Sequence, residues 1–352
     1  MNFQLTVEPL GETIDVAEGQ TILDACLRVG IPLPHACGHG LCGTCKTQVL
    51  EGEYDHGSAS PFALMDFERE EGFVLACTAT LHSDVTVEAD VEEDPDARRI
   101  PVRDFHATVE TIDDLTHDVK GVRLHLGEAI DFQAGQYVNL TFPGVEGSRA
   151  FSIANPPSDS EHVELQIRRV PGGAGTGYVH EKLKIGDKFT ISGPYGRFLV
   201  RKSRGGPMLF LAGGTGVSSP RAMILDLLEG GCTAPLTLIH GVRTSADLYG
   251  ADEFNALATK HLNFRYVPTL SSEPANSSWT GERGFVHDVA KAFYGDNFEG
   301  NTAYLCGPPP MIEACIATLI QGRLFEKSIF TEQFLTAKDA EAKPKSPVFK
   351  RF

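Results

Sequence analysis

The sequence lacks any hydrophobic run long enough to cross a membrane as a helix. No stretch approaches the roughly 18 consecutive apolar residues that a spanning helix needs. The N-terminus also lacks the basic segment followed by an apolar segment that marks a secretory signal. We therefore expect a cytoplasmic protein without a membrane partner. The length of 352 residues exceeds what one hydrophobic core holds and predicts two or three domains.

Basic residues are scarce in the first quarter of the chain. Residues 1–94 contain 3 Lys and Arg against 18 Asp and Glu, a net charge of −15, whereas residues 95–352 contain 28 against 29, a net charge of −1. The deficit argues against a nucleic-acid partner, because phosphates are bound by Lys and Arg. The acidic surface either keeps the protein soluble or steers a basic partner to a docking face, and both interpretations stay open.

Composition and turn residues divide the chain into segments. We predict domains over residues 1–94, 104–203 and 204–335, a linker over 95–103 and a tail over 336–352. The linker is charged, contains two Pro and has no apolar period, whereas the tail is polar, rich in Lys and Pro, and expected to be mobile.

Each domain has its own pattern of elements. In the first domain, strands over 3–7, 13–16, 46–50, 74–81 and 85–91 are expected around helices over 21–30 and 62–70, in an order that resembles the β-grasp ferredoxin fold. The second domain has short β-rich runs punctuated by Gly and Pro, which predict an antiparallel barrel. The third alternates strands with helices, which predicts a Rossmann-like parallel sheet. The fold class is therefore multi-domain α+β and α/β.

Four of the eight cysteines have the spacing of a plant-type [2Fe–2S] centre. These are Cys37, Cys42, Cys45 and the distant Cys77. A structural zinc site would use paired short Cys-x2-4-Cys steps, of which only one is present. A Rieske centre would need two His in place of two Cys, and His39 inside the loop is better explained as a loop residue.

Glycines separate the cluster ligands in the loop CGHGLCGTC. Gly38, Gly40 and Gly43 can adopt positive φ and bring their N–H groups close to the cluster sulfurs. Cys26 lies on an apolar helix before this loop, where we expect a buried small hydrophobe.

Two motifs in the barrel segment predict FAD. Arg149, Phe151 and Ser152 resemble the Arg-x-Tyr-Ser/Thr motif of the ferredoxin–NADP reductase superfamily, with Phe in place of the usual Tyr. An Arg supplies a bidentate cation for a pyrophosphate, an aromatic covers part of the cofactor, and a small hydroxyl can reach flavin N5. The run Gly173-Ala174-Gly175-Thr176 opens a helix and offers free N–H groups to a phosphate. Together the two motifs favour FAD over FMN.

A glycine-rich turn after a buried strand predicts a pyridine-nucleotide site. The turn includes Gly214, Thr215 and Gly216 and precedes a helix, an arrangement that binds a diphosphate. Ser219 stands where the third glycine of the Rossmann fingerprint would be, and the run resembles the Gly-Gly-Thr-Gly-x-x-Pro signature of ferredoxin–NADP reductase relatives.

Near the end of the domain, a second motif resembles the Cys-Gly-Pro-x-x-Met motif of the same family. Its residues are Cys306, Gly307, Pro308 and Met311. In the family this motif lies by the nicotinamide. Taken without the other motifs, Cys306 would read as a buried cysteine at the end of a strand.

The stretch TLSSEP over 269–274 indicates the choice of nucleotide. It has no Arg for a 2′-phosphate, and its Glu273 would repel one, so we predict NADH. Arg243, after the preceding strand, could serve either nucleotide.

With these motifs in order, the chain resembles the reductase component of multicomponent phenol hydroxylases. The resemblance extends to SPFALMD, FQAGQYVNL, RAFSIANPP, ILDLLE and AYLCGPPPMI, and covers nearly the whole chain except the tail. It implies that Ser152, Cys306 and Glu332 act at the flavin and nicotinamide, and that Phe334 lies beside the flavin ring. It also implies an oxygenase or hydroxylase partner, di-iron in the phenol case, docking near the acidic ferredoxin domain.

The expected electron path follows from what each carrier holds. NADH delivers two electrons at once, a [2Fe–2S] cluster accepts one, and FAD handles both, so the path runs from NADH to FAD to the cluster and then to the hydroxylase. Three alternatives stay open: a reductase for an aromatic-ring-hydroxylating dioxygenase, a stand-alone NAD(P)H oxidase or diaphorase, and an electron carrier with a vestigial nucleotide domain.

Overall fold

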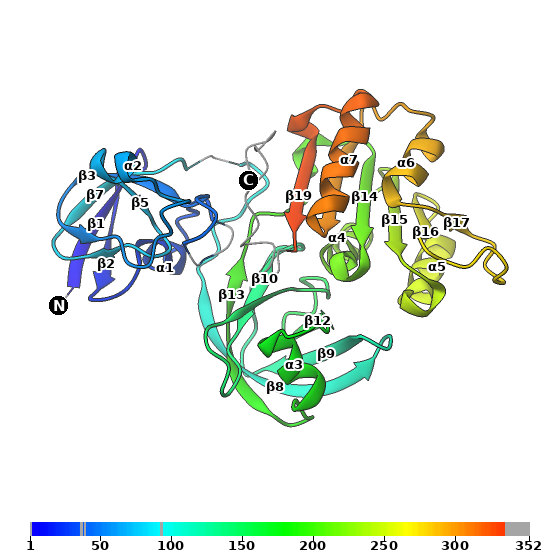
Figure 1. Ribbon diagram of the computed structural model, residues 1–352, viewed down its shortest axis with the longest axis horizontal. Helices are drawn as coiled ribbons and strands as arrows, with labels where there is room; N and C mark the ends of the chain where they lie inside the picture. Colours follow the sequence, from blue (N-terminus) through cyan, green and yellow to red (C-terminus); the bar gives the residue numbers. More distant parts are fainter. Residues whose placement is uncertain (1, 36–37, 39, 92–93, 335–352) are drawn as a thin grey trace. The chain divides into compact units, whose positions relative to one another are not determined.

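The chain forms two compact units that divide between Arg103 and Asp104. They are seen in a computed structural model that describes residues 2–35, 38, 40–91 and 94–334 (Figure 1). Cys37, His39 and the predicted tail over 336–352 lie outside the described residues.

The first unit has the β-grasp architecture expected from the sequence. Its five-stranded sheet has the order β2-β1-β7-β3-β5, in which β1 pairs antiparallel with β2 and parallel with β7. The elements of this sheet are β1 (Asn2–Glu8), β2 (Glu12–Ala17), β3 (Lys46–Glu51), β5 (Phe73–Leu75) and β7 (Val85–Glu88). The remaining elements are α1 (Ile22–Arg28), α2 (Asp66–Glu70) and a two-stranded ladder of β4 (Tyr54–Asp55) and β6 (Thr80–Leu81).

Helix α1 has a capping residue at its start and a glycine just after its end. The Thr21 hydroxyl accepts a hydrogen bond from the Asp24 N–H at 3.3 Å, which caps the first turn. Gly30 follows with φ of +84°, a conformation that releases the chain from the helix. Cys26 is fully buried on the inner face of this helix, as predicted, and burial raises its pKa to about 12.

Two predicted elements of the first unit differ in the structure. The helix expected over 62–70 begins only at Asp66, because Met65 is extended and its N–H is capped by the Glu68 carboxylate at 2.9 Å. The strand expected over 74–81 is interrupted by a turn, in which Thr78 and Ala79 both donate to the Leu75 carbonyl. That turn carries Cys77 out of the sheet.

The second unit begins with the predicted antiparallel barrel. Its six strands have the order β11-β10-β13-β8-β9-β12, and the two edges approach each other where the Ala154 N–H donates to the Glu164 carbonyl at 2.8 Å. The sheet is therefore nearly closed around an apolar interior. Its elements are β8 (Arg103–Asp114), β9 (Val119–Leu126), β10 (Tyr137–Leu140), β11 (Arg149–Ser152), β12 (His162–Arg168), β13 (Lys188–Tyr195) and the helix α3 (Ala174–Glu181).

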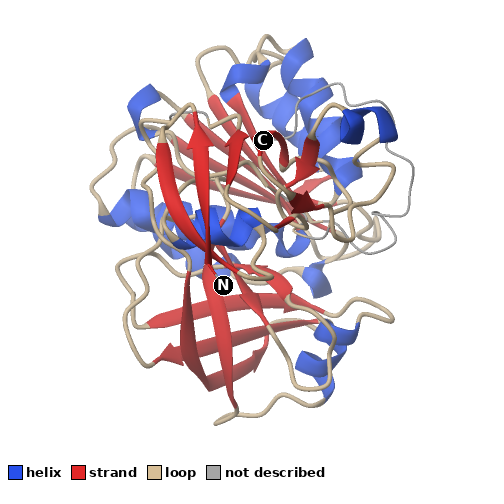
Figure 2. Ribbon diagram, turned by 90° about the vertical axis from the view of Figure 1, so that its left-hand side faces the viewer, coloured by secondary structure: helices blue, strands red, loops and turns tan. Residues whose placement is uncertain are grey.

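The second half of this unit is the predicted parallel sheet, with the order β17-β16-β15-β14-β18-β19. One face packs on α4 and α5 and the other on α6 and α7 (Figures 1 and 2). The strands are β14 (Met208–Gly213), β15 (Leu236–Val242), β16 (Phe264–Leu270), β17 (Glu282–Arg283), β18 (Thr302–Gly307) and β19 (Ile329–Gln333). The helices are α4 (Ser218–Glu229), α5 (Ala251–Lys260), α6 (Val286–Tyr294) and α7 (Pro309–Gln321), with 3-10 turns η1 (Lys202–Arg204), η2 (Gly214–Val217), η3 (Ser245–Asp247) and η4 (Glu326–Ser328).

None of the helices in the described part of the chain combines the length and the apolar character that crossing a membrane requires.

Candidate functional site

The cluster loop of the first unit brings cysteines from two segments together. The Gly40 N–H donates a hydrogen bond to the Cys77 sulfur at 3.2 Å, the type of contact expected for a cluster ligand. Gly40 has φ of +74°, and a Cβ there would lie 2.8 Å from Thr78 Cγ2. The loop therefore needs glycine both for its backbone angle and for its approach to the Cys77 turn.

One of the described cysteines has the lowered pKa expected of a thiolate ligand. Cys77 forms a hydrogen bond to Cys45 that lowers the pKa of the Cys45 thiol. Cys42 and Cys77 both interact with Cys45, and the lowered pKa of Cys45 suits a thiolate ligand of an iron–sulfur cluster. The fourth predicted ligand, Cys37, is outside the described residues.

The two predicted flavin motifs meet at one end of the barrel. Arg149 begins β11, and a Cβ on Gly175 of α3 would lie only 2.7 Å from the Arg149 Cγ. The Arg149 guanidinium donates to the carbonyls of Glu146 and Ser148 at 3.1 and 2.9 Å. A strand residue and a helix residue that are distant in sequence are therefore neighbours, and only glycine leaves room for the arginine.

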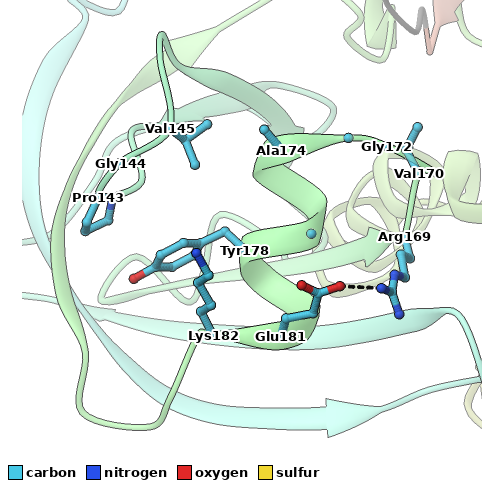
Figure 3. Close-up of a pocket in the computed structure, with 12 residues that line it drawn as sticks. Pro143, Gly144, Val145, Arg169, Val170, Gly172, Ala174, Tyr178, Glu181 and Lys182 are labelled. Carbon is cyan, nitrogen blue, oxygen red and sulfur yellow. Dashed lines mark hydrogen bonds and ion pairs between the residues drawn. The ribbon is translucent and has the colours of Figure 1, made fainter.

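The turn that opens α3 borders a cavity of about 360 Å³ (Figure 3). Gly173 is the N-cap residue and makes no side-chain cap, so the first-turn N–H groups have no side-chain acceptor at that position. The Thr176 hydroxyl is engaged within the loop, because it accepts from the Val170 N–H at 3.1 Å. Tyr178 and Lys182, further along the same helix, also line the cavity, and Pro143 and Val145 line it from a facing loop. A polar wall, an aromatic ring and a helix N-terminus fit a phosphate-bearing cofactor.

The nucleotide motifs lie at the carboxyl edge of the parallel sheet. Gly214 has φ of +55° directly after β14. A Cβ on Gly216 would lie 2.3 Å from the Cys306 carbonyl oxygen, so the turn packs against the end of β18. Thr215 lies between these glycines. The glycine-rich turn is thus shaped both for a ligand and for contact with the second motif.

The Cys-Gly-Pro-x-x-Met residues complete this edge. Cys306 is fully buried near the end of β18, and Pro308 is the N-cap residue of α7. The Met311 sulfur lies beside the turn, at 2.4 Å from a Cβ built on Gly213 and 3.2 Å from one built on Gly307. The two motifs, which are far apart in sequence, therefore form one continuous wall.

Two of the residues predicted to act at the reacting rings, Ser152 and Cys306, converge on a carboxylate oxygen of the third, Glu332. Glu332 Oε2 accepts hydrogen bonds from the Ser152 hydroxyl at 3.2 Å, the Cys306 thiol at 3.5 Å and the Ser219 hydroxyl at 2.7 Å. Burial raises the pKa of Glu332, and these hydrogen bonds oppose that rise. Burial and the neighbouring carboxylate also raise the pKa of Cys306. This group of side chains thus favours a protonated Cys306 thiol and a Glu332 carboxyl that can hold a proton.

Phe334 follows this carboxylate and is tied to the same wall. Its N–H donates to the Gly307 carbonyl at 3.0 Å, and its half-buried ring packs against the sheet core on the α4 side. The segment after β19 is therefore anchored to the nucleotide motif.

The predicted selectivity residues follow two neighbouring strands, Arg243 after β15 and Glu273 after β16. Arg243 is exposed there. The Glu273 carboxylate accepts from the Ser245 N–H at 2.8 Å and from the Ser245 hydroxyl at 3.1 Å, and these bonds lower its pKa. A carboxylate of the chain itself therefore fills the donors that could otherwise bind a 2′-phosphate.

Two residues near the site had no predicted role. Ser219 was noted only as a departure from the third glycine, yet it makes the shortest contact to Glu332. His240 is buried in β15, and its Nε2 lies 3.1 Å from the Gly214 carbonyl. Burial lowers the pKa of His240 to about 4, so the ring is neutral and suited to donate to that carbonyl. A histidine within the apolar run LTLIHGV carries no sequence signal for this contact.

Family comparisons agree with the three parts of the chain. Residues 5–82 match the 2Fe-2S iron-sulfur cluster binding domain, residues 106–199 match the oxidoreductase FAD-binding domain, and residues 210–316 match the oxidoreductase NAD-binding domain. The chain therefore carries domains for all three expected cofactors.

Similar proteins cover the full length. The chain is 55% identical over all of its length, and all of the relative, to the phenol 2-monooxygenase reductase component DmpP of Pseudomonas sp. (strain CF600). It is 54% identical to the phenol hydroxylase P5 protein of Acinetobacter pittii (strain PHEA-2), over 99% of each chain. Among solved structures, the Amycolatopsis cytochrome P450 reductase GcoB has a TM-score of 0.87 and 38% identity, over 94% of this chain and 98% of that one.

Proposed function

The chain belongs to the family of reductase components of multicomponent phenol hydroxylases, and we propose that it supplies electrons from NADH to a di-iron oxygenase that hydroxylates phenol or a similar aromatic. The observation that carries the proposal is the convergence of Ser152, from the FAD domain, and Cys306, from the NAD domain, on Glu332. Residues expected beside the flavin and beside the nicotinamide thus share one carboxylate.

When bound, NADH supplies a hydride, FAD accepts its two electrons and releases them singly, and the cluster carries one electron at a time. The residues of the chain hold these groups and manage protons. Arg149 and the first turn of α3 are suited to the FAD pyrophosphate. Gly214 and Gly216 admit the nucleotide diphosphate to the sheet edge. Glu332, whose pKa is raised by burial, is the carboxyl placed to exchange a proton beside the site.

NADH is the proposed nucleotide because of Glu273. Its carboxylate occupies both donors of Ser245 and would repel a 2′-phosphate. The proposed cytoplasmic location, where NADH is generated, remains a prediction from the sequence.

The oxygenase is proposed to dock on the ferredoxin domain near the cluster loop. Four large apolar side chains of the loop, of α2 and of the segment between them are at least half exposed: Leu41, Phe62, Met65 and Phe67. Asp66, Glu70 and Glu71, close to Met65 and Phe67 in sequence, are also exposed, and residues 1–94 carry a net charge of −15. An apolar centre with a charged rim is typical of protein interfaces, and the charge favours a basic partner.

The test is an anaerobic titration of the purified protein with NADH, followed by visible absorption and low-temperature EPR. Bleaching of the flavin bands with one reduced [2Fe–2S] signal per chain supports the path. Phenol turnover with a purified phenol hydroxylase at a rate well above the uncoupled oxygen reaction supports the partner. Equal NADH consumption with and without the hydroxylase would favour a stand-alone oxidase, and coupling only to a ring-hydroxylating dioxygenase would favour that alternative.

A further inference from the structure

The FAD and NAD domains meet along one face of β12 and one face of α4. Glu164 and Gln166 are two residues apart in the strand, and their side chains therefore point to the same side of it. Ser218 and Arg221 are three residues apart in the helix and also share a face. These four residues form what we call the β12–α4 seam.

Arg221 is the centre of the seam. Its guanidinium donates to the Ala154 carbonyl at 2.6 Å and to Glu164 at 2.9 Å, both in the FAD domain. On its other side it forms a bidentate pair with Glu253 of α5, with both distances 2.8 Å. Its side chain is only 16% exposed. One cation therefore joins the barrel to two helices of the nucleotide domain.

A second contact of the seam lies one turn earlier on α4. The Ser218 hydroxyl donates to Gln166 Oε1 at 2.9 Å, and the Tyr249 hydroxyl reaches the same oxygen at 3.2 Å. Ser218 and Ser219 immediately follow the glycine-rich turn, and Ser219 contacts Glu332. The first turn of α4 is thus linked at once to the barrel, the nucleotide turn and the carboxylate.

We propose that Arg221 is a positioning residue for hydride transfer, because its cross-domain contacts fix the nucleotide turn relative to the barrel. The inference rests on the proposed function. Hydride transfer depends steeply on geometry, and a displacement of about 1 Å can reduce its rate about a hundredfold. The hydrogen-bond partners of Arg221 are Ala154, Glu164 and Glu253, none of which is assigned to the flavin or the nicotinamide, so its loss should alter the rate of the step more than nucleotide affinity.

The experiment compares variants that break different sides of the same guanidinium. Arg221→Lys keeps the charge but cannot span all three partners. Glu164→Gln weakens the contact across the domains, whereas Glu253→Gln weakens a contact inside the NAD domain. Because Glu164 also pairs with Arg123, Glu110→Gln, which weakens another Arg123 contact within the barrel, is the matched control.

Anaerobic rapid mixing with NADH gives the limiting rate of flavin reduction and the half-saturating NADH concentration separately. For Arg221→Lys and Glu164→Gln, we expect a rate lower by about tenfold or more and a half-saturating concentration changed less than about threefold. Glu253→Gln and Glu110→Gln should change the rate much less. Hydrogen exchange should also be faster at the start of α4 in the first two variants, a readout independent of turnover.

Equal rates in all four variants and the unaltered protein would overturn the proposal. So would an equal loss in Glu164→Gln and Glu253→Gln, because the contact across the domains would then have no special effect. Retained flavin content and an unchanged unfolding transition exclude misfolding. Failure of the unaltered protein to reduce its flavin with NADH would instead contradict the proposed function.

Discussion

The Ser219 hydroxyl donates to Glu332 Oε2 at 2.7 Å, a shorter contact than either Ser152 or Cys306 makes to the same oxygen. Ser219 is fully buried in the first turn of α4, and Glu332 is the penultimate residue of the edge strand β19. Three donors on one oxygen stabilise the carboxylate, whereas burial favours the protonated carboxyl. The protonation of Glu332 therefore depends on how many of these donors remain.

Ser219→Ala should raise the pKa of Glu332 further, because it removes a hydrogen bond that lowers that pKa. A higher pKa means that Glu332 keeps its proton to higher pH. We expect the limb of the pH–rate profile that reports Glu332 to move to higher pH, as measured by anaerobic flavin reduction with NADH. Ser219→Thr, which keeps the hydroxyl, should leave the limb in place. A limb that stays fixed or moves to lower pH in Ser219→Ala would contradict the assignment.

Gly216→Ala and Gly213→Ala should differ in stability, although Gly213 ends β14 and Gly216 lies in the turn that follows directly. A Cβ on Gly216 would lie 2.3 Å from the Cys306 carbonyl oxygen, and backbone cannot move aside cheaply. A Cβ on Gly213 would meet the Met311 sulfur at 2.4 Å, and a methionine side chain can rotate away. We expect Gly216→Ala to destabilise the domain by roughly 1–3 kcal/mol and Gly213→Ala by less, in chemical unfolding. Equal losses of stability would show that the close contact of Gly216 with the Cys306 carbonyl of β18 does not determine the cost of the substitution.

The motif residues were predictable from the sequence because each has a local signature. The positive φ of Gly40 and the turn after β14 follow from glycines placed where a loop must bend sharply. The alternation of strands and helices after residue 205 predicted the parallel sheet and thus the edge where the motifs meet.

The contacts between distant segments were not predictable in the same way. Ser219 and Glu332 are 113 positions apart, and no local pattern couples a helix-start serine to an edge-strand glutamate. Arg221 had no predicted role, because its partners Ala154 and Glu164 lie in another domain. The break in the strand expected over 74–81 was missed because VLACTATL is uniformly strand-like, whereas the turn there serves to present Cys77.

Glu273→Ser should improve the use of NADPH. The change removes a negative charge and frees the Ser245 N–H and hydroxyl, both of which can donate to a 2′-phosphate. We expect the ratio of kcat/KM for NADPH to that for NADH to rise by about tenfold, in steady-state reduction of ferricyanide. Glu282→Ser removes an exposed carboxylate from β17 and serves as the control. A higher kcat/KM with NADPH than with NADH in the unaltered protein would contradict the premise.

The proposed docking face should depend on both an apolar centre and an acidic rim. Phe62 is 88% exposed. It lies beside the cluster loop, because the Ser60 N–H donates to the Gly40 carbonyl at 3.0 Å and so holds residues 58–65 against that loop. Phe62→Ser should therefore raise the KM for the hydroxylase by about fivefold or more, since buried aromatics dominate interfaces. Leu262→Ser is the matched control, because Leu262 is fully exposed on the NAD domain.

Charge contributes to the same encounter and can be separated from the apolar contact. Added salt should slow coupled turnover at limiting hydroxylase while leaving ferricyanide reduction unchanged, because screening acts on the encounter and not on the internal path. Neutral substitutions of Asp and Glu within residues 51–71 should reduce this salt dependence, whereas Phe62→Ser should leave it intact. If coupled turnover were insensitive to salt and to those substitutions, the negative charge of the ferredoxin domain would serve solubility, and the docking face would have to be sought elsewhere.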